Sequence, residues 1–164
     1  NTVTTSGNPP TPPTPPTPPP TTLRYPQVVL DAAVWVSAAI PQEQQHTSSR
    51  QWIDQYLAAS GVLVISEWFI VEVAAAIGRR VSPLHGQRAY MRVYSLSQIT
   101  IVPMSRQLMQ DSAATAAALR LRAVDAVYVA LAQQLGLPVV SWDGEIAQRG
   151  GPRVLVFDPG NFPW

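Results

Sequence analysis

LRLRAVDAVYVALAQQLGLPVVSWD, residues 119–143, is the stretch from which the fold is predicted most directly. Its Ala-rich first part belongs to a long helical segment, residues 106–136. We expect two helices there with a break near RLRAVD, because so long a helix without caps is unusual in a small domain. Gly-Leu-Pro leads into the apolar run LPVVS (137–141). Short apolar runs without polar alternation are typical of strands in a parallel sheet covered on both faces.

The same alternation of helix and strand patterns extends over the chain from Leu23 onward. Further strands are predicted at 27–30, 62–66, 99–102 and 153–157, and further helices at 48–59, 66–80 and 86–97. Strands that alternate with helices indicate helices packed on both faces of one sheet. The predicted fold class is therefore α/β, a three-layer α/β/α sandwich with a mostly parallel central sheet of about five strands.

Composition limits the domain organisation and the classes of site. Residues 1–22 are mostly Pro and Thr and are predicted to be a disordered tail or linker, because they offer little apolar surface to offset the entropy of ordering. The folded part is then one domain, residues 23–164. The chain has no Cys, which excludes thiolate metal sites, and no apolar run approaches the ~20 residues that span a bilayer. The net charge of +1 argues neither for nor against nucleic acid.

Two acids follow predicted strands. Asp31 comes directly after VVL, and Asp143 follows PVVSW. In open α/β sheets ligands bind beyond the carboxyl ends of the strands, so both acids are expected at one rim of the sheet. The alternative is that each Asp caps the helix that follows it, since Asp accepts backbone N–H bonds well.

Two more acids lie within apolar helical sequence, where an isolated ionised carboxylate would be costly. Glu72 stands in WFIVEVAAAI, and its alternative role is a buried ion pair with Arg79 or Arg80. Asp125 stands in RAVDAVYVALA, and its alternative role is the N-cap of a helix. Glu67 would point about 140° away from Glu72 on a helix, and we expect it to be an exposed residue of the first turn.

Four carboxylates in one pocket would repel one another unless a cation compensates them. Mg²⁺ and Mn²⁺ prefer oxygen ligands, which carboxylates supply. The two histidines, His46 and His85, are expected to face solvent and not a metal ion. The acids therefore predict a site for a hard divalent cation.

Taken in order, these segments resemble the PIN domain, in particular the toxin ribonucleases of VapBC-type (type II) toxin–antitoxin pairs. The resemblance rests on VVLDAAVWV, ISEWFIVEVAAAI and the stretch quoted first, and it covers about residues 27–158. It implies a cytoplasmic endoribonuclease that depends on Mg²⁺ or Mn²⁺. It also implies the catalytic and metal-binding acids, which are Asp31, Glu72, Asp125 and Asp143, with Ser141 as the polar residue of the last motif.

Two positions bear on how far this resemblance extends. The family usually carries a small polar residue two positions after the first Asp, and this chain has Ala33 there. Loss of that hydroxyl favours the alternative function, a catalytically weak or inactive PIN-fold binding module. Glu145 is either an extra outer ligand or an exposed acid at a helix start. A phospho-acceptor domain is the least favoured class, because it would normally need a Lys and the chain has none.

The resemblance also implies the partners and the mechanism. The cation held by Asp31, Asp125 and Asp143 would promote attack of water on the RNA phosphate, Glu72 would hold a second ion or a water, and an antitoxin would cover the groove. RNA contacts are expected from arginines, unless these only form solvated helix faces. The candidates are Arg79, Arg80, Arg88, Arg92, Arg120 and Arg122. The apolar helices at 66–77 and 86–97 predict a two-fold homodimer.

Overall fold

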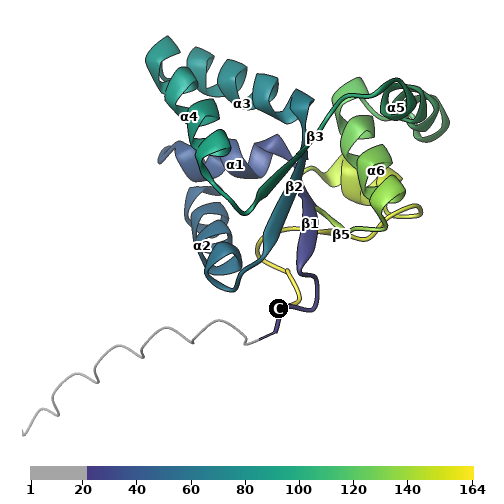
Figure 1. Ribbon diagram of the computed structural model, residues 1–164, viewed down its shortest axis with the longest axis horizontal. Helices are drawn as coiled ribbons and strands as arrows, with labels where there is room; N and C mark the ends of the chain where they lie inside the picture. Colours follow the sequence, from purple (N-terminus) through teal and green to yellow (C-terminus); the bar gives the residue numbers. More distant parts are fainter. Residues whose placement is uncertain (1–21) are drawn as a thin grey trace, which may run out of the picture.

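The computed structural model of this protein describes residues 22–164 (Figure 1). The tail predicted for residues 1–22 lies outside this range except for its last residue. The domain predicted for residues 23–164 lies within it. No helix of this described part is long and apolar enough to cross a membrane.

Five parallel strands form one sheet in the order β3-β2-β1-β4-β5. The strands are β1 (Gln27–Leu30), β2 (Val62–Ser66), β3 (Ile99–Val102), β4 (Val139–Val140) and β5 (Val156–Phe157). The predicted sheet is therefore confirmed, and β1, β2 and β3 have their predicted bounds. In the central strand β1, residues 28–30 are completely buried, which is why its sequence shows no polar alternation.

The last two strands are shorter than the predicted runs 137–141 and 153–157. Pro138 has no backbone N–H with which to extend a ladder of hydrogen bonds. The N–H groups of Arg153 and Val154 donate to the carbonyl of Gly150 at 2.8 and 3.1 Å, which makes a turn there. Apolar composition therefore located both strands but not the residues at which pairing begins.

Helices cover both faces of the sheet, with α1 to α4 on one side and α5 and α6 on the other (Figure 1). They are α1 (Ala32–Ala39), α2 (His46–Ala58), α3 (Glu67–Arg80), α4 (Pro83–Ser95), α5 (Arg106–Leu119) and α6 (Ala123–Leu135), and a short wide helical turn, η1 (Ile146–Gly150), precedes β5. The three-layer architecture is confirmed. The predicted helix break lies at residues 120–122, where Arg120 takes a left-handed backbone with φ of 54°.

The predicted set of helices was wrong to omit α1 and η1. Helix α1 is buried on nearly every side, so its sequence has no polar face from which a helical period can be detected. Helix α4 begins earlier than predicted. Pro83 suits the first helical position, and the hydroxyl of Ser82 caps the helix by accepting a hydrogen bond from the N–H of His85.

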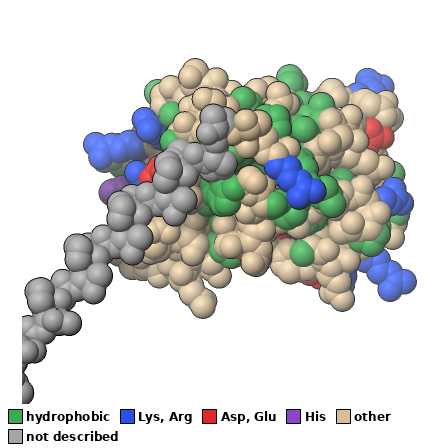
Figure 2. Space-filling view, turned by 90° about the horizontal axis from the view of Figure 1, so that it is seen from below, with side chains coloured by type: hydrophobic (Ala, Val, Ile, Leu, Met, Phe, Trp, Pro, Cys, Tyr) green, Lys and Arg blue, Asp and Glu red, His purple; other side chains and the backbone are tan. Residues whose placement is uncertain are grey.

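Aromatic side chains close the amino-terminal end of the sheet. Trp52 and Tyr56 stack with their ring centroids 4.9 Å apart, and Phe162 packs edge-on against both. Tyr56 also donates a hydrogen bond to the carbonyl of Tyr25, just before β1. Figure 2, seen from this end, shows hydrophobic side chains among tan atoms, with several arginines at the edge and one nearer the middle of the face. Charged groups gather instead at the opposite end of the strands.

Candidate active site

A groove of about 710 Å³ opens at the carboxyl ends of the strands, and all four predicted acids line it. Asp31 follows β1 and Asp143 follows β4, whereas Glu72 lies in the second turn of α3 and Asp125 in the first turn of α6. Four separate segments therefore contribute one carboxylate each. The parallel sheet is what brings these segments together, because its carboxyl ends share one edge.

Asp31 both caps a helix and lines the groove. It is the N-cap of α1, where its Oδ1 accepts a hydrogen bond from the N–H of Ala33 at 3.0 Å. Its Oδ2 accepts a second bond, at 2.6 Å, from the hydroxyl of Ser141. Burial raises the pKa of Asp31 above its ordinary value, and the two hydrogen bonds oppose that rise. Asp31 therefore serves both as a helix cap and as an acid of the groove, two roles that the sequence interpretation had treated as alternatives.

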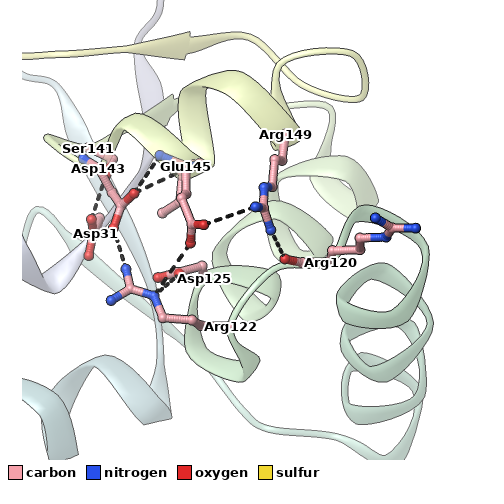
Figure 3. Close-up of polar contacts among 9 residues, drawn as sticks. Asp31, Arg120, Arg122, Asp125, Ser141, Asp143, Glu145 and Arg149 are labelled. Atoms are coloured by element: carbon pink, nitrogen blue, oxygen red, sulfur yellow. Dashed lines mark hydrogen bonds and ion pairs between the residues drawn. The ribbon is translucent and has the colours of Figure 1, made fainter.

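Ser141 joins Asp31 to the last acidic segment. Its hydroxyl donates to Asp31 and accepts from the backbone N–H of Asp143 at 2.8 Å (Figure 3). Asp143 in turn accepts hydrogen bonds through Oδ1 from the N–H groups of Glu145 and Ile146, at 2.6 and 3.4 Å, so it caps the turn that leads into η1. The second oxygen of Asp143, Oδ2, contacts the guanidinium of Arg122. One serine thus fixes the relative positions of two carboxylates.

Glu72 is held by a residue that the sequence interpretation missed. Its Oε2 accepts a hydrogen bond from the hydroxyl of Tyr128 on α6, and this hydroxyl accepts one from the N–H of Ala32. The alternative ion pair of Glu72 with Arg79 or Arg80 was wrong: in the structure, Arg80 pairs with Glu43. The sequence did contain a sign of this role. Tyr128 follows Asp125 by three residues, and residues three apart on a helix lie on the same face, so Tyr128 could have been predicted to lie near the acids.

Burial raises the pKa of Glu72 to about 7, the nearby charges of Asp31 and Asp125 add to the rise, and the hydrogen bond from Tyr128 opposes it. Burial likewise raises the pKa of Asp125 above its ordinary value, against the effect of Arg122. Negative charge in the groove is therefore incompletely compensated by the protein itself.

Asp125 is not the N-cap of α6, so that alternative was wrong. The N-cap is Arg122, which makes no capping bond with its side chain. Its guanidinium turns toward the acids, where Nε lies 2.6 Å from Asp125 Oδ2 and Nη2 contacts Asp143 Oδ2 (Figure 3). Asp125 and Asp143 are therefore bridged by one arginine.

Of the other acids, Glu43 also lines the groove and pairs with Arg80, whereas Glu145 and Glu67 lie at the edge of the site or outside it. Glu145 is partly exposed at the start of η1, with its Oε1 3.2 Å from Arg149 Nη2 and its Oε2 3.9 Å from Arg122 Nε. Glu67 is exposed in the first turn of α3, as predicted, and accepts a hydrogen bond from the N–H of Met104. It does not line the groove.

Neither histidine lines the groove. His85 is exposed, as predicted, and contacts the hydroxyl of Ser82. His46 also lies away from the groove, but it is only partly exposed, with its Nδ1 3.0 Å from the carbonyl of Ser37. Its position at the start of α2 turns the ring toward α1 instead.

The donor set of the groove fits a hard divalent cation by its chemistry. Its acidic side chains offer carboxylate oxygens, which are the ligands that such cations prefer. Burial raises the pKa of Asp31, Glu72 and Asp125, and a bound cation would stabilise their ionised forms. Among residues 22–164, however, no three His, Asp or Glu side chains are arranged as a metal site. Arg122 lies between two of the carboxylates in this arrangement.

The raised pKa of Glu72 predicts how the stability of the metal-free protein depends on pH. The pKa is about 7 in the folded chain against an ordinary 4.5, so folding favours the protonated form. This contribution to stability is present below pH 4.5 and is lost as the pH rises through about 7. Melting temperatures in EDTA should fall over this window, and less steeply for Glu72→Gln. Parallel curves for the two proteins would contradict the assignment.

Comparison with known proteins gives a family match and several structural neighbours. The family model described as the PIN domain matches residues 28–152. The structure is similar to VapC20 of Mycobacterium tuberculosis, a toxin that cleaves the sarcin–ricin loop, with a TM-score of 0.63, 13% identity, and coverage of 73% of this chain and 92% of that one. No curated protein sequence matches the chain.

Two toxin–antitoxin assemblies are also similar in structure. VapBC2 of Rickettsia felis, bound to a DNA fragment from its promoter, has a TM-score of 0.61 at 14% identity, over 80% of this chain and 98% of that one. A toxin–antitoxin complex from Klebsiella pneumoniae has a TM-score of 0.56 at 22% identity, over 80% and 97%. At such identities the likeness is one of fold.

Proposed function

This chain belongs to the PIN domain family, and we propose that it is a metal-dependent endoribonuclease that acts as the toxin of a toxin–antitoxin pair. The structural neighbours that are toxins or toxin–antitoxin complexes support the toxin role. The proposed substrate is RNA, the proposed cofactor is Mg²⁺ or Mn²⁺, and the proposed place of action is the cytoplasm, beside an antitoxin.

One observation carries this proposal: the four predicted carboxylates, from four segments, line a single groove, which Glu43 also lines. Asp31 and Asp125 are buried, and burying charged carboxylates together costs stability unless a cation offsets their repulsion. A hydrophobic residue of similar size would serve the fold better at Asp125, which caps no helix. The presence of these carboxylates in the groove therefore favours a catalytic role over a purely structural one.

We assign Asp31, Asp125 and Asp143 to the binding of the cation and Glu72 to a second ion or a water. When bound, the cation would neutralise the scissile phosphate and activate water for in-line attack. Ser141 positions the carboxylates of Asp31 and Asp143 relative to each other. Tyr128 positions the carboxylate of Glu72 by donating a hydrogen bond from its hydroxyl to Oε2.

RNA would reach the acids along α3. Of the six candidate arginines, Arg79, Arg80 and Arg122 line the groove, whereas Arg88, Arg92 and Arg120 do not. A planar guanidinium group can donate two parallel hydrogen bonds to two oxygens of one phosphate, so these arginines could hold the backbone of a bound RNA strand. Trp68, which also lines the groove, is 44% exposed and offers a face on which an unpaired base can stack.

The alternative is a PIN-fold binding module that has lost its activity. Ala33 lines the groove and holds Asp31 through its backbone N–H, but its methyl group supplies no hydroxyl to the site. Calorimetric titration of Mn²⁺ into the EDTA-treated chain separates the two functions. The nuclease should bind Mn²⁺ with micromolar to sub-millimolar affinity, and an Asp143→Asn control should bind much more weakly. Absence of binding in the folded parent chain would favour the binding module.

The homodimer is a further part of this proposal. Large hydrophobic side chains are exposed on α3, on α4 and between them, and a surface of this kind on a small domain usually marks an interface. They are Trp68, Val71, Val81, Leu84, Met91 and Tyr94. Light scattering at micromolar concentration should give twice the chain mass of 17.8 kDa. Met91→Arg should shift the protein toward monomer, and a monomer mass for the parent would contradict the proposal.

A further inference from the structure

We propose that Arg122 is an internal competitor of the divalent cation, a positioning residue that holds Asp125 and Asp143 together until the cation takes its place. The inference rests on the proposed function, since it concerns the same carboxylates. It assigns to this arginine a role different from RNA contact: Arg122 would set the cation concentration at which the site fills.

The contacts show that arginine and cation would need the same oxygen atoms. Arg122 Nε lies 2.6 Å from Asp125 Oδ2, and Nη2 contacts Asp143 Oδ2 (Figure 3). The other oxygen of Asp143 already accepts backbone N–H bonds at the start of η1. Asp143 therefore has one oxygen facing the groove, and the guanidinium is bound to it. A cation coordinated by this oxygen would compete with the guanidinium for it, because two positive groups held at one oxygen repel each other.

The local sequence explains why the guanidinium lies there. Arg122 occupies the N-cap of α6, where a Ser, Thr, Asp or Asn side chain would accept a backbone N–H bond. Arginine has only donors, so it cannot cap the helix. Its side chain is thereby left without a helix-capping role, and the nearest acceptors are Asp125, three residues later, and Asp143.

The same geometry allows the arginine to leave. Its side chain is 65% exposed, whereas that of Asp125 is 9% exposed, so the guanidinium can move into solvent without opening the core. Glu145 lies 3.9 Å from Arg122 Nε and is itself held by Arg149, whose guanidinium also donates to the carbonyl of Arg120. This anchored acid offers the displaced arginine a partner at the edge of the groove.

The high solvent exposure of the Arg122 side chain limits how much it can weaken cation binding. Two charge-assisted hydrogen bonds to a largely exposed guanidinium are screened by solvent, so the competition should weaken cation binding without preventing it. We expect removal of the arginine to tighten Mn²⁺ binding about tenfold.

The test is calorimetric titration of Mn²⁺ into the EDTA-treated full chain, without RNA. Arg122→Gln should bind Mn²⁺ about tenfold more tightly than the parent, and Arg122→Lys should fall between them, because a single ammonium cannot bridge two carboxylates as the fork does. Arg79→Gln is the matched control. It removes the same charge from the same groove but makes no ion pair with an acid in the described part of the chain, so its affinity should change less than about threefold.

Melting in EDTA gives a second readout that needs no cation. Arg122→Gln should melt at a lower temperature than the parent, because Asp125 loses its charged partner, and added Mn²⁺ should raise its melting temperature more than it raises that of the parent. Equal Mn²⁺ affinity for Arg122→Gln and the parent, or an equal gain in Arg79→Gln, would overturn the inference and leave the proposed function intact. Absence of Mn²⁺ binding in every folded protein would instead overturn the proposed function, and the inference with it. If Arg122→Gln does not fold, the comparison of Arg122→Lys with the parent decides.

Discussion

Asp125→Asn is expected to reduce RNA cleavage on the order of 100-fold or more, while the chain stays folded. The substitution removes a negative charge from the proposed cation site and hardly changes the side-chain volume. Asp125 is 6% exposed and burial raises its pKa, so the folded protein gains little from its charge. The amide can still accept the hydrogen bond from Arg122. The melting temperature in EDTA should therefore be unchanged or higher, and the loss of activity cannot be attributed to unfolding.

Glu67→Gln is the control for this substitution. Glu67 is also an acid in the first turn of a helix, but it is exposed and does not line the groove. Its replacement should leave cleavage unchanged, because the amide still accepts the hydrogen bond from Met104. Parent-like cleavage by Asp125→Asn would mean that Asp125 only supports the start of α6. Equal losses in both variants would mean that the assay reports something other than the groove.

Ser141→Ala is expected to have the next largest effect, about a 10- to 100-fold loss of cation affinity and of cleavage. The hydroxyl is buried, donates to Asp31 and accepts from the N–H of Asp143. Without it, Asp31 Oδ2 loses a donor and the N–H of Asp143 loses an acceptor. Both carboxylates are then less well positioned. Mn²⁺ titration of the EDTA-treated variant measures the first effect, and cleavage of RNA at saturating Mn²⁺ measures the second.

Ser112→Ala provides the matched comparison. Ser112 is also buried, but it donates to the carbonyl of Leu108 within α5, away from the acids. Its replacement should cost a similar modest amount of stability, about 1 kcal/mol, without changing Mn²⁺ affinity. If Ser141→Ala bound Mn²⁺ as tightly as Ser112→Ala does, the hydroxyl would serve the fold and not the site.

The strands of this fold could be predicted from sequence because a parallel sheet buried on both faces requires uninterrupted apolar runs. Strands β1 and β2 are largely buried and had their predicted bounds. The edge strand β3 also had its predicted bounds, although its residues are only partly buried and Thr100 is exposed. Helix α1 could not be found by periodicity, because it is buried on nearly all sides and lacks a polar face. The bounds of β4 and β5 depend on backbone hydrogen bonds such as those around Gly150, which composition does not encode.

The acids of the site were visible in the sequence, whereas their partners were not. Glu72 was conspicuous because a carboxylate in an apolar helix is costly. Its partner Tyr128 is 56 residues away and reaches it only because α3 and α6 meet at the end of the sheet. Arg122 was considered only for RNA contact, since its pairing with Asp143 spans 21 residues and crosses from α6 to the end of β4. Local patterns identify groups that need a partner, and the tertiary fold decides which partner they find.

Cleavage of RNA by the purified full chain, first in excess EDTA and then after excess Mn²⁺ is added, tests whether the groove is the site of a metal-dependent nuclease. We predict no cleavage in EDTA and restored cleavage with Mn²⁺ for the parent chain, and at least 100-fold weaker cleavage for Asp125→Asn. Cleavage that persists in EDTA, or a folded parent chain that cuts no RNA with Mn²⁺ present, would contradict the account.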